Sequence, residues 1–200
     1  AYMIYDEIRI IFTIFASAFL PIILLLLLRS RLKIWIFKYY FTTLIICILG
    51  WELWFTYGIL GGDTVEIRRS EFLNSWIPQN INWLLNSLAD AGTVCLGGLL
   101  LTYLIFRRST EIFTKWQLGP FIVFYSWCLL QNVYVELFVY QDQLAQGNEL
   151  SWAPLSPAGN LFNPMLFQWG NKSLYLQTQM PWILFGPIAY WLAIKFAKKN

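Results

Sequence analysis

Two carboxylic acids, Glu52 and Asp90, are the residues of this sequence with the clearest potential for chemistry. Each stands inside a run of apolar residues long enough to cross a membrane. A charged group at the centre of such a run costs about 2.5 to 3.5 kcal/mol on insertion scales, so acids retained there commonly mark function. A third acid, Glu136, lies within a turn of the end of its run, and we expect it to be mostly solvated.

The composition indicates that these acids belong to a membrane protein. Of the 200 residues, 58% are hydrophobic and only 12% are charged, more apolar side chain than a soluble domain of this size needs. Five runs can cross a hydrocarbon core of about 30 Å. We therefore expect an all-α integral membrane protein, a five-helix transmembrane bundle forming one domain over residues 1–200. The predicted spans are 8–28, 34–60, 81–106, 118–140 and 179–196, with a cap loop at 141–178.

The charges between the spans predict an orientation. The loops after the first and third spans and the C-terminal tail are basic, whereas the N-terminus and the other two loops are neutral or acidic. The positive-inside rule then places the N-terminus in the lumen or outside and the C-terminus in the cytoplasm. The cap loop mixes Pro, Gly and aromatic residues, which suggests a folded cap at the interface, and its Asn171 begins a glycosylation sequon on the predicted lumenal side.

Several other classes of site are disfavoured by what the sequence lacks. It has no histidine, the commonest metal ligand and proton shuttle. Its three cysteines, Cys47, Cys95 and Cys128, are scattered through apolar segments, where packing is the simplest role. We therefore expect no metal and no cofactor. No basic patch interleaved with aromatics is present, so nucleic acid is not an expected partner.

Counting along the helices places Glu52 and Asp90 at one depth. Glu52 lies eight residues before the outer end of the second predicted span, and Asp90 lies nine residues after the outer start of the third. At 1.5 Å per residue, both lie roughly 12 to 14 Å below the outer boundary. Other polar and aromatic residues at similar depth are Asn86, Thr93, Gln131, Asn132, Gln179, Trp51, Trp54, Tyr57, Trp83, Trp127, Tyr134 and Trp182. We expect a polar, aromatic-walled pocket in the outer half of the bilayer.

Such a pocket suits a cation. Two neighbouring carboxyl groups in a medium of low dielectric constant are not both comfortably ionised, so one is protonated or a cation lies between them. Aromatic faces attract cations as well. The pocket would therefore accept a lipophilic amine or a reaction that passes through a carbocation, with one acid giving a proton and the other taking one. The simpler alternative is that the acids and amides only hold helices together.

Three motifs carry a resemblance to a known family. They are GWELWFTYGILGGD with Glu52, DAGTVCLGG with Asp90, and QMPW with Gln179 and Trp182. In these motifs and in its five-span plan the chain resembles the emopamil-binding protein family, the sterol Δ8–Δ7 isomerases, and their sigma-2 receptor relatives, which share the EXPERA membrane domain. One departure matters most, because Ile48 stands where the isomerases have a histidine. In addition, the third-span acid is Asp rather than Glu, and the amide is Gln rather than Asn.

The resemblance implies roles for individual residues. Glu52 would be the proton donor or amine counter-ion, and Asp90 its acidic partner and proton acceptor. Trp182 would stabilise a cation with its ring face, and Gln179 would orient the acids. Trp54 and Asn132 complete the expected substrate-binding set. The implied ligand is a sterol or an amphiphilic amine in contact with membrane lipid, and the implied location is the endoplasmic reticulum. The missing histidine leaves isomerase activity open.

Other readings of the same residues remain. The chain would also suit a non-catalytic structural subunit of a larger membrane protein complex, in which Glu52 and Asp90 hold helices or meet polar groups of a partner. A homodimer is a further possibility. A small transporter is a weaker hypothesis, because the inner halves of the spans offer no polar path.

Overall fold

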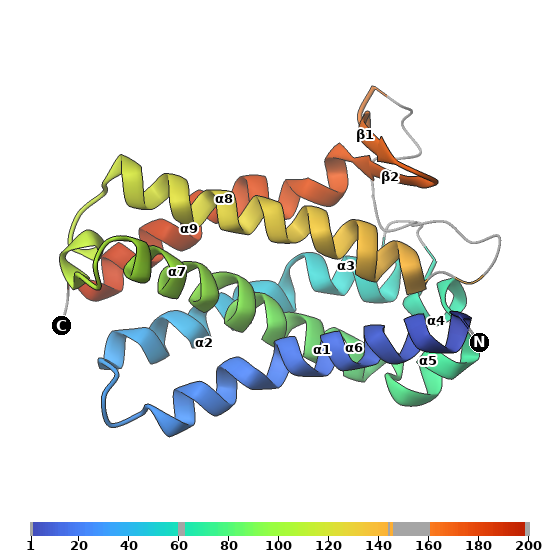
Figure 1. Cartoon of the computed structure of the whole chain (residues 1–200), viewed down its shortest axis with the longest axis horizontal. Helices are drawn as coiled ribbons and strands as arrows, with labels where there is room; N and C mark the ends of the chain where they lie inside the picture. Colours follow the sequence, from blue (N-terminus) through green and yellow to red (C-terminus); the bar gives the residue numbers. More distant parts are fainter. Residues whose placement is uncertain (1, 60–62, 144, 146–160, 199–200) are drawn as a thin grey trace.

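The computed structural model describes residues 2–59, 63–143, 145 and 161–198. Its long helices run side by side along one axis, with the N-terminus at one end of the bundle and the C-terminus at the other (Figure 1). We call these the N-terminal end and the C-terminal end of the bundle. The elements are α1 (Tyr2–Leu27), α2 (Ile34–Leu49), α3 (Trp51–Tyr57), α4 (Val65–Arg68), α5 (Glu71–Trp76), α6 (Gln79–Ala89), η1 (Asp90–Leu96), α7 (Gly97–Ile105), η2 (Thr110–Phe113), α8 (Leu118–Val135), η3 (Glu136–Tyr140), η4 (Gln141–Gln143), β1 (Met165–Trp169), β2 (Lys172–Tyr175) and α9 (Leu176–Ala197).

The helices agree with the expected membrane character. Four are long and apolar enough to cross a membrane, namely Tyr5–Leu27, Gln79–Ile105, Leu118–Gln143 and Leu176–Ala197. A fifth span exists if α2 and α3, which meet at an angle of 41°, are counted as one. The all-α membrane class is thus supported, and the predicted orientation stays a prediction.

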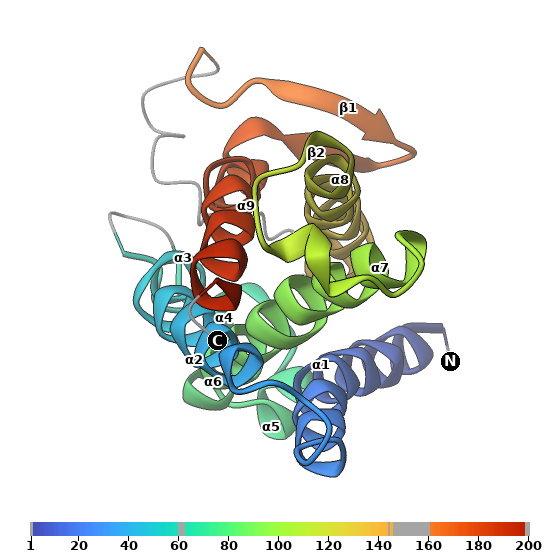
Figure 2. The ribbon, with the colours of Figure 1, turned by 90° about the vertical axis from the view of Figure 1, so that its left-hand side faces the viewer.

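The packing of the bundle brings distant parts of the chain together. Helix α1 packs on α6 and η1, α2 packs on η1 and α9, and α8 lies between α7 and α9. Figure 2 shows these pairs end-on, with α1 and the α8–α9 pair on opposite sides of the bundle. The C-terminal half is a continuous core of aromatic, aliphatic and thiol groups. It includes all three cysteines, which are buried and free, as the packing interpretation expected.

The second span is broken at Gly50. A Cβ atom on Gly50 would lie 2.7 Å from the backbone oxygen of Ile46, so the turn between α2 and α3 requires glycine. The Trp83 indole donates a hydrogen bond of 2.9 Å to the backbone oxygen of Ile48. This bond satisfies a carbonyl beside the break, and it uses the backbone of the position where the isomerases have histidine.

The third span contains a wider turn, the π-helical segment η1, which begins at Asp90. Its carbonyl groups are partly satisfied from other helices, because the Trp127 indole donates to the backbone oxygens of Thr93 and Val94 at 3.3 and 3.1 Å. Pro21 of α1 has no N–H for the oxygen of Ser17, four residues earlier. The Thr93 hydroxyl donates to that oxygen at 2.7 Å. The π segment therefore supplies the hydrogen bond that Pro21 leaves missing in α1, and α8 supplies one to the π segment.

The expected cap loop is partly described. The fourth helix continues through the π-helical η3 and the short η4, and a two-stranded antiparallel sheet of β1 and β2 leads into α9. Residues 144 and 146–160 of the predicted cap lie outside the described residues.

Candidate functional site

A cavity of about 220 Å³ lies in the N-terminal half of the bundle. Its walls come from α1, α3, α6 with η1, α8 with η3, and α9, so every long helix except α2 contributes. The polar side chains that line it are Thr13, Ser17, Glu52, Asn86, Asp90, Thr93, Gln131, Asn132 and Thr178. The polar pocket expected from the sequence therefore corresponds to a cavity, whose volume is below the roughly 300 to 1,000 Å³ typical of ligand sites.

The two acids meet in this cavity. The side chains of Glu52 and Asp90 interact directly with one another, and Asn86 interacts with Glu52. Glu52 is 1% exposed, and its Oε2 atom has no hydrogen-bond partner among the described residues. Glu52 lies in the first turn of α3, the helix that begins after the Gly50 break. Asp90 is the first residue of the π-helical segment η1. The arrangement holds a carboxyl pair with one oxygen left to bind something else.

Asp90 is held by a tryptophan. The Trp51 indole donates a hydrogen bond of 2.7 Å to Asp90 Oδ2 and so fixes the position of that carboxyl group. Trp51 also packs edge-on against Trp182, with ring centroids 5.3 Å apart. Both rings line the cavity next to the acids. Asp90 thus has the surroundings of an acceptor, and the cavity has an aromatic wall.

The six predicted site residues are not all at the cavity. Glu52, Asp90, Asn132 and Trp182 line it, and Asn132 also joins α8 to α9 by donating to the backbone oxygen of Thr178 at 3.0 Å. Trp54 is 40% exposed and lies outside the lining. Gln179 is buried, but it does not line the cavity either. The role in orienting the acids that the resemblance implies for Gln179 stays a prediction, and a hydrogen bond to the pair comes from Trp51.

A buried arginine, Arg68, lies behind the cavity wall at Phe55. The Arg68 guanidinium lies 4.6 Å from the centroid of the Phe55 ring and donates to the Phe55 backbone oxygen. The Phe55 ring in turn packs on Tyr140 at 4.4 Å, and both rings line the cavity. Burial lowers the pKa of Arg68 to about 10, so this side chain stays positively charged at neutral pH. Its charge acts on Glu52 and Glu136.

The expectation that Glu136 is mostly solvated is wrong. Its side chain is fully buried, and neither carboxyl oxygen has a hydrogen-bond partner by geometry in the described part of the chain. The physical reason is that α8 does not end in solvent there, because η3 and η4 continue it beneath β2 and against α1. Glu136 does not line the cavity, but it interacts with Arg68 and with Tyr140, which does.

Sequence reasoning did not name several residues of the site, among them Thr13, Ser17, Thr178 and Tyr140, and it did not name Arg68 behind Phe55. The first two are hydroxyl groups one helical turn apart in an otherwise apolar first span, a spacing that puts both on one face and was a usable signal. Tyr140 was only the predicted last residue of its span. Arg68 stood in a predicted loop, where nothing local indicated burial.

The site offers no metal centre among the residues described, since no group of three His, Cys, Asp or Glu side chains is placed to hold an ion. Comparison with protein-family models, curated proteins and solved structures gives no significant match. The resemblance to the emopamil-binding family therefore continues to rest on the three sequence motifs.

Proposed function

We propose that the chain is a membrane protein that binds a lipophilic amine or a sterol in the cavity around Glu52 and Asp90. The observation that carries this proposal is the carboxyl pair of buried Glu52 and half-buried Asp90 beside two tryptophan rings, with a Glu52 oxygen left unpartnered among the described residues. An ammonium group between the acids would supply the missing charge, and the rings of Trp51 and Trp182 would favour it further.

The charges around the pair favour a single cation as the ligand. Arg68 acts on Glu52 from behind Phe55 and partly compensates its charge, whereas Asp90 is stabilised by the Trp51 hydrogen bond. The pair therefore does not need two positive charges from a ligand. The rest of the wall is apolar and aromatic, which suits a hydrophobic body attached to one polar or charged group.

The same pair could move a double bond in a sterol without a histidine. Glu52, when protonated, would give its proton to one carbon of the double bond, which leaves a carbocation. Asp90 would then take a proton from a neighbouring carbon, so that the double bond re-forms one position away. Because the two carboxyl groups interact directly, the proton can return from Asp90 to Glu52 and restore the starting state. Ile48 does not line the cavity and has no part in this cycle.

The experiment that tests the proposal is saturable binding of a radiolabelled lipophilic amine to the purified chain. We expect Glu52→Gln and Asp90→Asn each to lose about tenfold or more in affinity, since a hydrogen-bonded charge interaction contributes about 1.5 to 3 kcal/mol. Glu111→Gln is the matched control, because this acid is exposed near η2 at the opposite end of the bundle.

Loss of binding in the two cavity variants with an unchanged control would support the proposal, and turnover of a Δ8 sterol would extend it to catalysis. Folded wild-type protein with no saturable binding would contradict it. Purification of the chain only together with other membrane subunits, with both acids at their contacts, would favour the structural-subunit alternative.

A further inference from the structure

The β1–β2 hairpin presents an unusual surface. Every residue of β1 (Met165–Trp169) is exposed, and four of the five are large and apolar. Trp169 is 64% exposed, and Leu161 and Phe162, just before the strand, are exposed as well. Exposed apolar side chains gathered on one hairpin indicate a surface that contacts a membrane or another protein.

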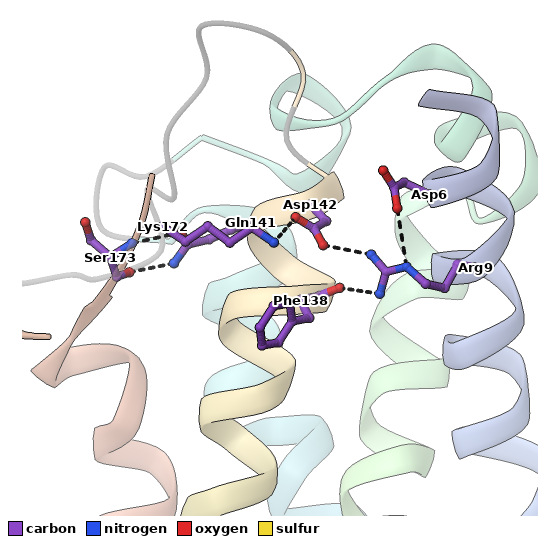
Figure 3. A network of polar contacts seen from close by, with 7 residues as sticks. All are labelled: Asp6, Arg9, Phe138, Gln141, Asp142, Lys172 and Ser173. Atoms are coloured by element: carbon purple, nitrogen blue, oxygen red, sulfur yellow. Dashed lines mark hydrogen bonds and ion pairs between the residues drawn. The ribbon is translucent and has the colours of Figure 1, made fainter. Parts of the chain in front are cut away.

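The second strand is fixed to the bundle by polar contacts (Figure 3). Lys172 forms an ion pair with Asp142 and lies 4.6 Å from the centroid of the Phe138 ring. The Ser173 N–H donates to Gln141 Oε1 at 3.2 Å, and the Gln141 amide donates back to the Ser173 oxygen. The side chain of Gln141 thus pairs with β2 as a neighbouring strand would. The hairpin therefore has a defined orientation, with β1 on its outer side.

Helix α1 is joined to the same network. Arg9 donates to Asp142 Oδ2 and to the backbone oxygen of Phe138, both at 2.7 Å (Figure 3). Asp142 therefore accepts from Arg9 on one side and from Lys172 on the other. The hairpin, the end of the fourth helix and α1 are held as one unit at the N-terminal end of the bundle.

The position of the hairpin identifies what covers it. β2 leads directly into α9 at Leu176, so the hairpin lies level with the end of a predicted span. Figure 1 shows it at the N-terminal end of the bundle, beside the C-terminal end of α8 and the start of α9, and Figure 2 shows it on the outer side of these two helices. A segment level with the helix ends and displaced sideways lies over the surrounding lipid.

We propose that the β1–β2 hairpin is a lipid-binding element whose apolar strand β1 lies in the headgroup region of the outer leaflet. Trp and Phe side chains at this level are typical membrane anchors. The apolar side chains of β1 keep the strand from rising into water. Its backbone keeps it from sinking into the hydrocarbon, because β1 has one unpaired edge in the two-stranded sheet and an open edge is not stable there. This proposal does not depend on what the cavity binds.

A nitroxide spin label at Phe167→Cys in the full chain, reconstituted in phosphatidylcholine bilayers, tests this directly. The native cysteines are fully buried, so an exposed new thiol is labelled selectively. The measurement compares relaxation by oxygen, which concentrates in lipid, with relaxation by a water-soluble nickel chelate. Leu130→Cys on the exposed face of α8 is the lipid reference, and Glu111→Cys is the water reference.

We expect the Phe167 label to show an oxygen-to-nickel ratio closer to that of Leu130 than to that of Glu111. Trp169→Cys should give the same result, which guards against a local effect of one substitution. A ratio equal to the water reference would overturn the proposal. Low accessibility to both reagents would also overturn it, because it would mean that protein, such as a second copy of the chain, covers the strand.

Discussion

The same membrane spans are regular helices in the C-terminal half of the bundle and irregular in the N-terminal half. In the C-terminal half, α2, α7 and the first part of α8 are regular helices that pack around Phe124, Tyr190 and the three cysteines. In the N-terminal half each of these spans is irregular, and each irregularity adjoins an acid. Glu52 follows the Gly50 break by two residues, Asp90 begins η1, and Glu136 begins η3.

Buried charge follows the same division. Among the described residues the buried charged side chains are Glu7, Glu52, Arg68, Arg69 and Glu136, and all belong to the N-terminal half. An α-helix satisfies its own backbone, so a regular span needs nothing from its neighbours. A break or π segment releases carbonyl groups that side chains must satisfy, and segments of this type frequently lie at functional sites. The N-terminal half therefore combines interrupted helices with buried polar groups, and both lower the stability of the empty bundle.

The largest effect is expected where the N-terminal half depends on one close contact. A Cβ atom on Gly92 in η1 would lie 2.6 Å from Pro21 Cβ, and neither group can move away easily. We expect Gly92→Ala to lower the free energy of unfolding by about 2 kcal/mol, the typical cost of overpacking. Gly97→Ala is the matched control, since its Cβ would meet nothing closer than 3.7 Å and alanine favours a helix.

Thermal unfolding in detergent measures both variants. Equal melting temperatures for Gly92→Ala and the wild-type chain would mean that the π segment tolerates displacement. The comparison between the halves would then lose its structural basis.

The sequence predicted the helices and the depth of the acids, which depend on position along the chain. It did not predict which side chains face the cavity, which depends on how the helices pack. The lengths of the apolar runs predicted the helices, and counting residues placed Glu52 and Asp90 at the same level, where the structure brings them into contact. Depth alone does not give the direction in which a side chain points. Trp54 and Trp51 lie within one helical turn of each other, yet Trp51 lines the cavity and Trp54 is 40% exposed outside it.

Burial of loop residues was beyond sequence reasoning for a related reason. Arg68 is buried against Phe55, which supplies both a ring face and a backbone oxygen for it and packs in turn on Tyr140 of another element. The hairpin likewise depends on Asp142 and Gln141 of the preceding helix end. Such contacts join residues far apart in the chain, so no local sequence pattern predicts them.

Substitutions of Trp51 and Trp54 compare a ring inside the cavity with a ring outside it. Trp51→Phe keeps a ring in the wall but removes the donor to Asp90, whereas Trp54→Phe changes a ring outside the cavity. We expect Trp51→Phe to weaken amine binding about tenfold, since hydrogen bonds to charged groups contribute about 1.5 to 3 kcal/mol. Trp54→Phe should leave the affinity unchanged. Equal losses in both variants would mean that the aromatic residues act through general packing and not through Asp90.

The smallest expected effect separates a binding role of Glu52 from a structural one. A buried acid that only holds helices together stabilises the fold, so its removal lowers the melting temperature. An acid kept for a ligand is a cost to the empty protein, so Glu52→Gln should raise the unfolding free energy by about 1 kcal/mol, part of the roughly 2.5 to 3.5 kcal/mol cost of a charge in a span. Asn132→Leu provides the contrast, because it removes the bond between α8 and α9 and should destabilise the chain by about 1 kcal/mol. Thermal unfolding of both variants without ligand gives the answer.

A loss of stability in Glu52→Gln that matches the loss in Asn132→Leu would assign Glu52 to helix packing. The carboxyl pair would then no longer distinguish the N-terminal half as a binding site.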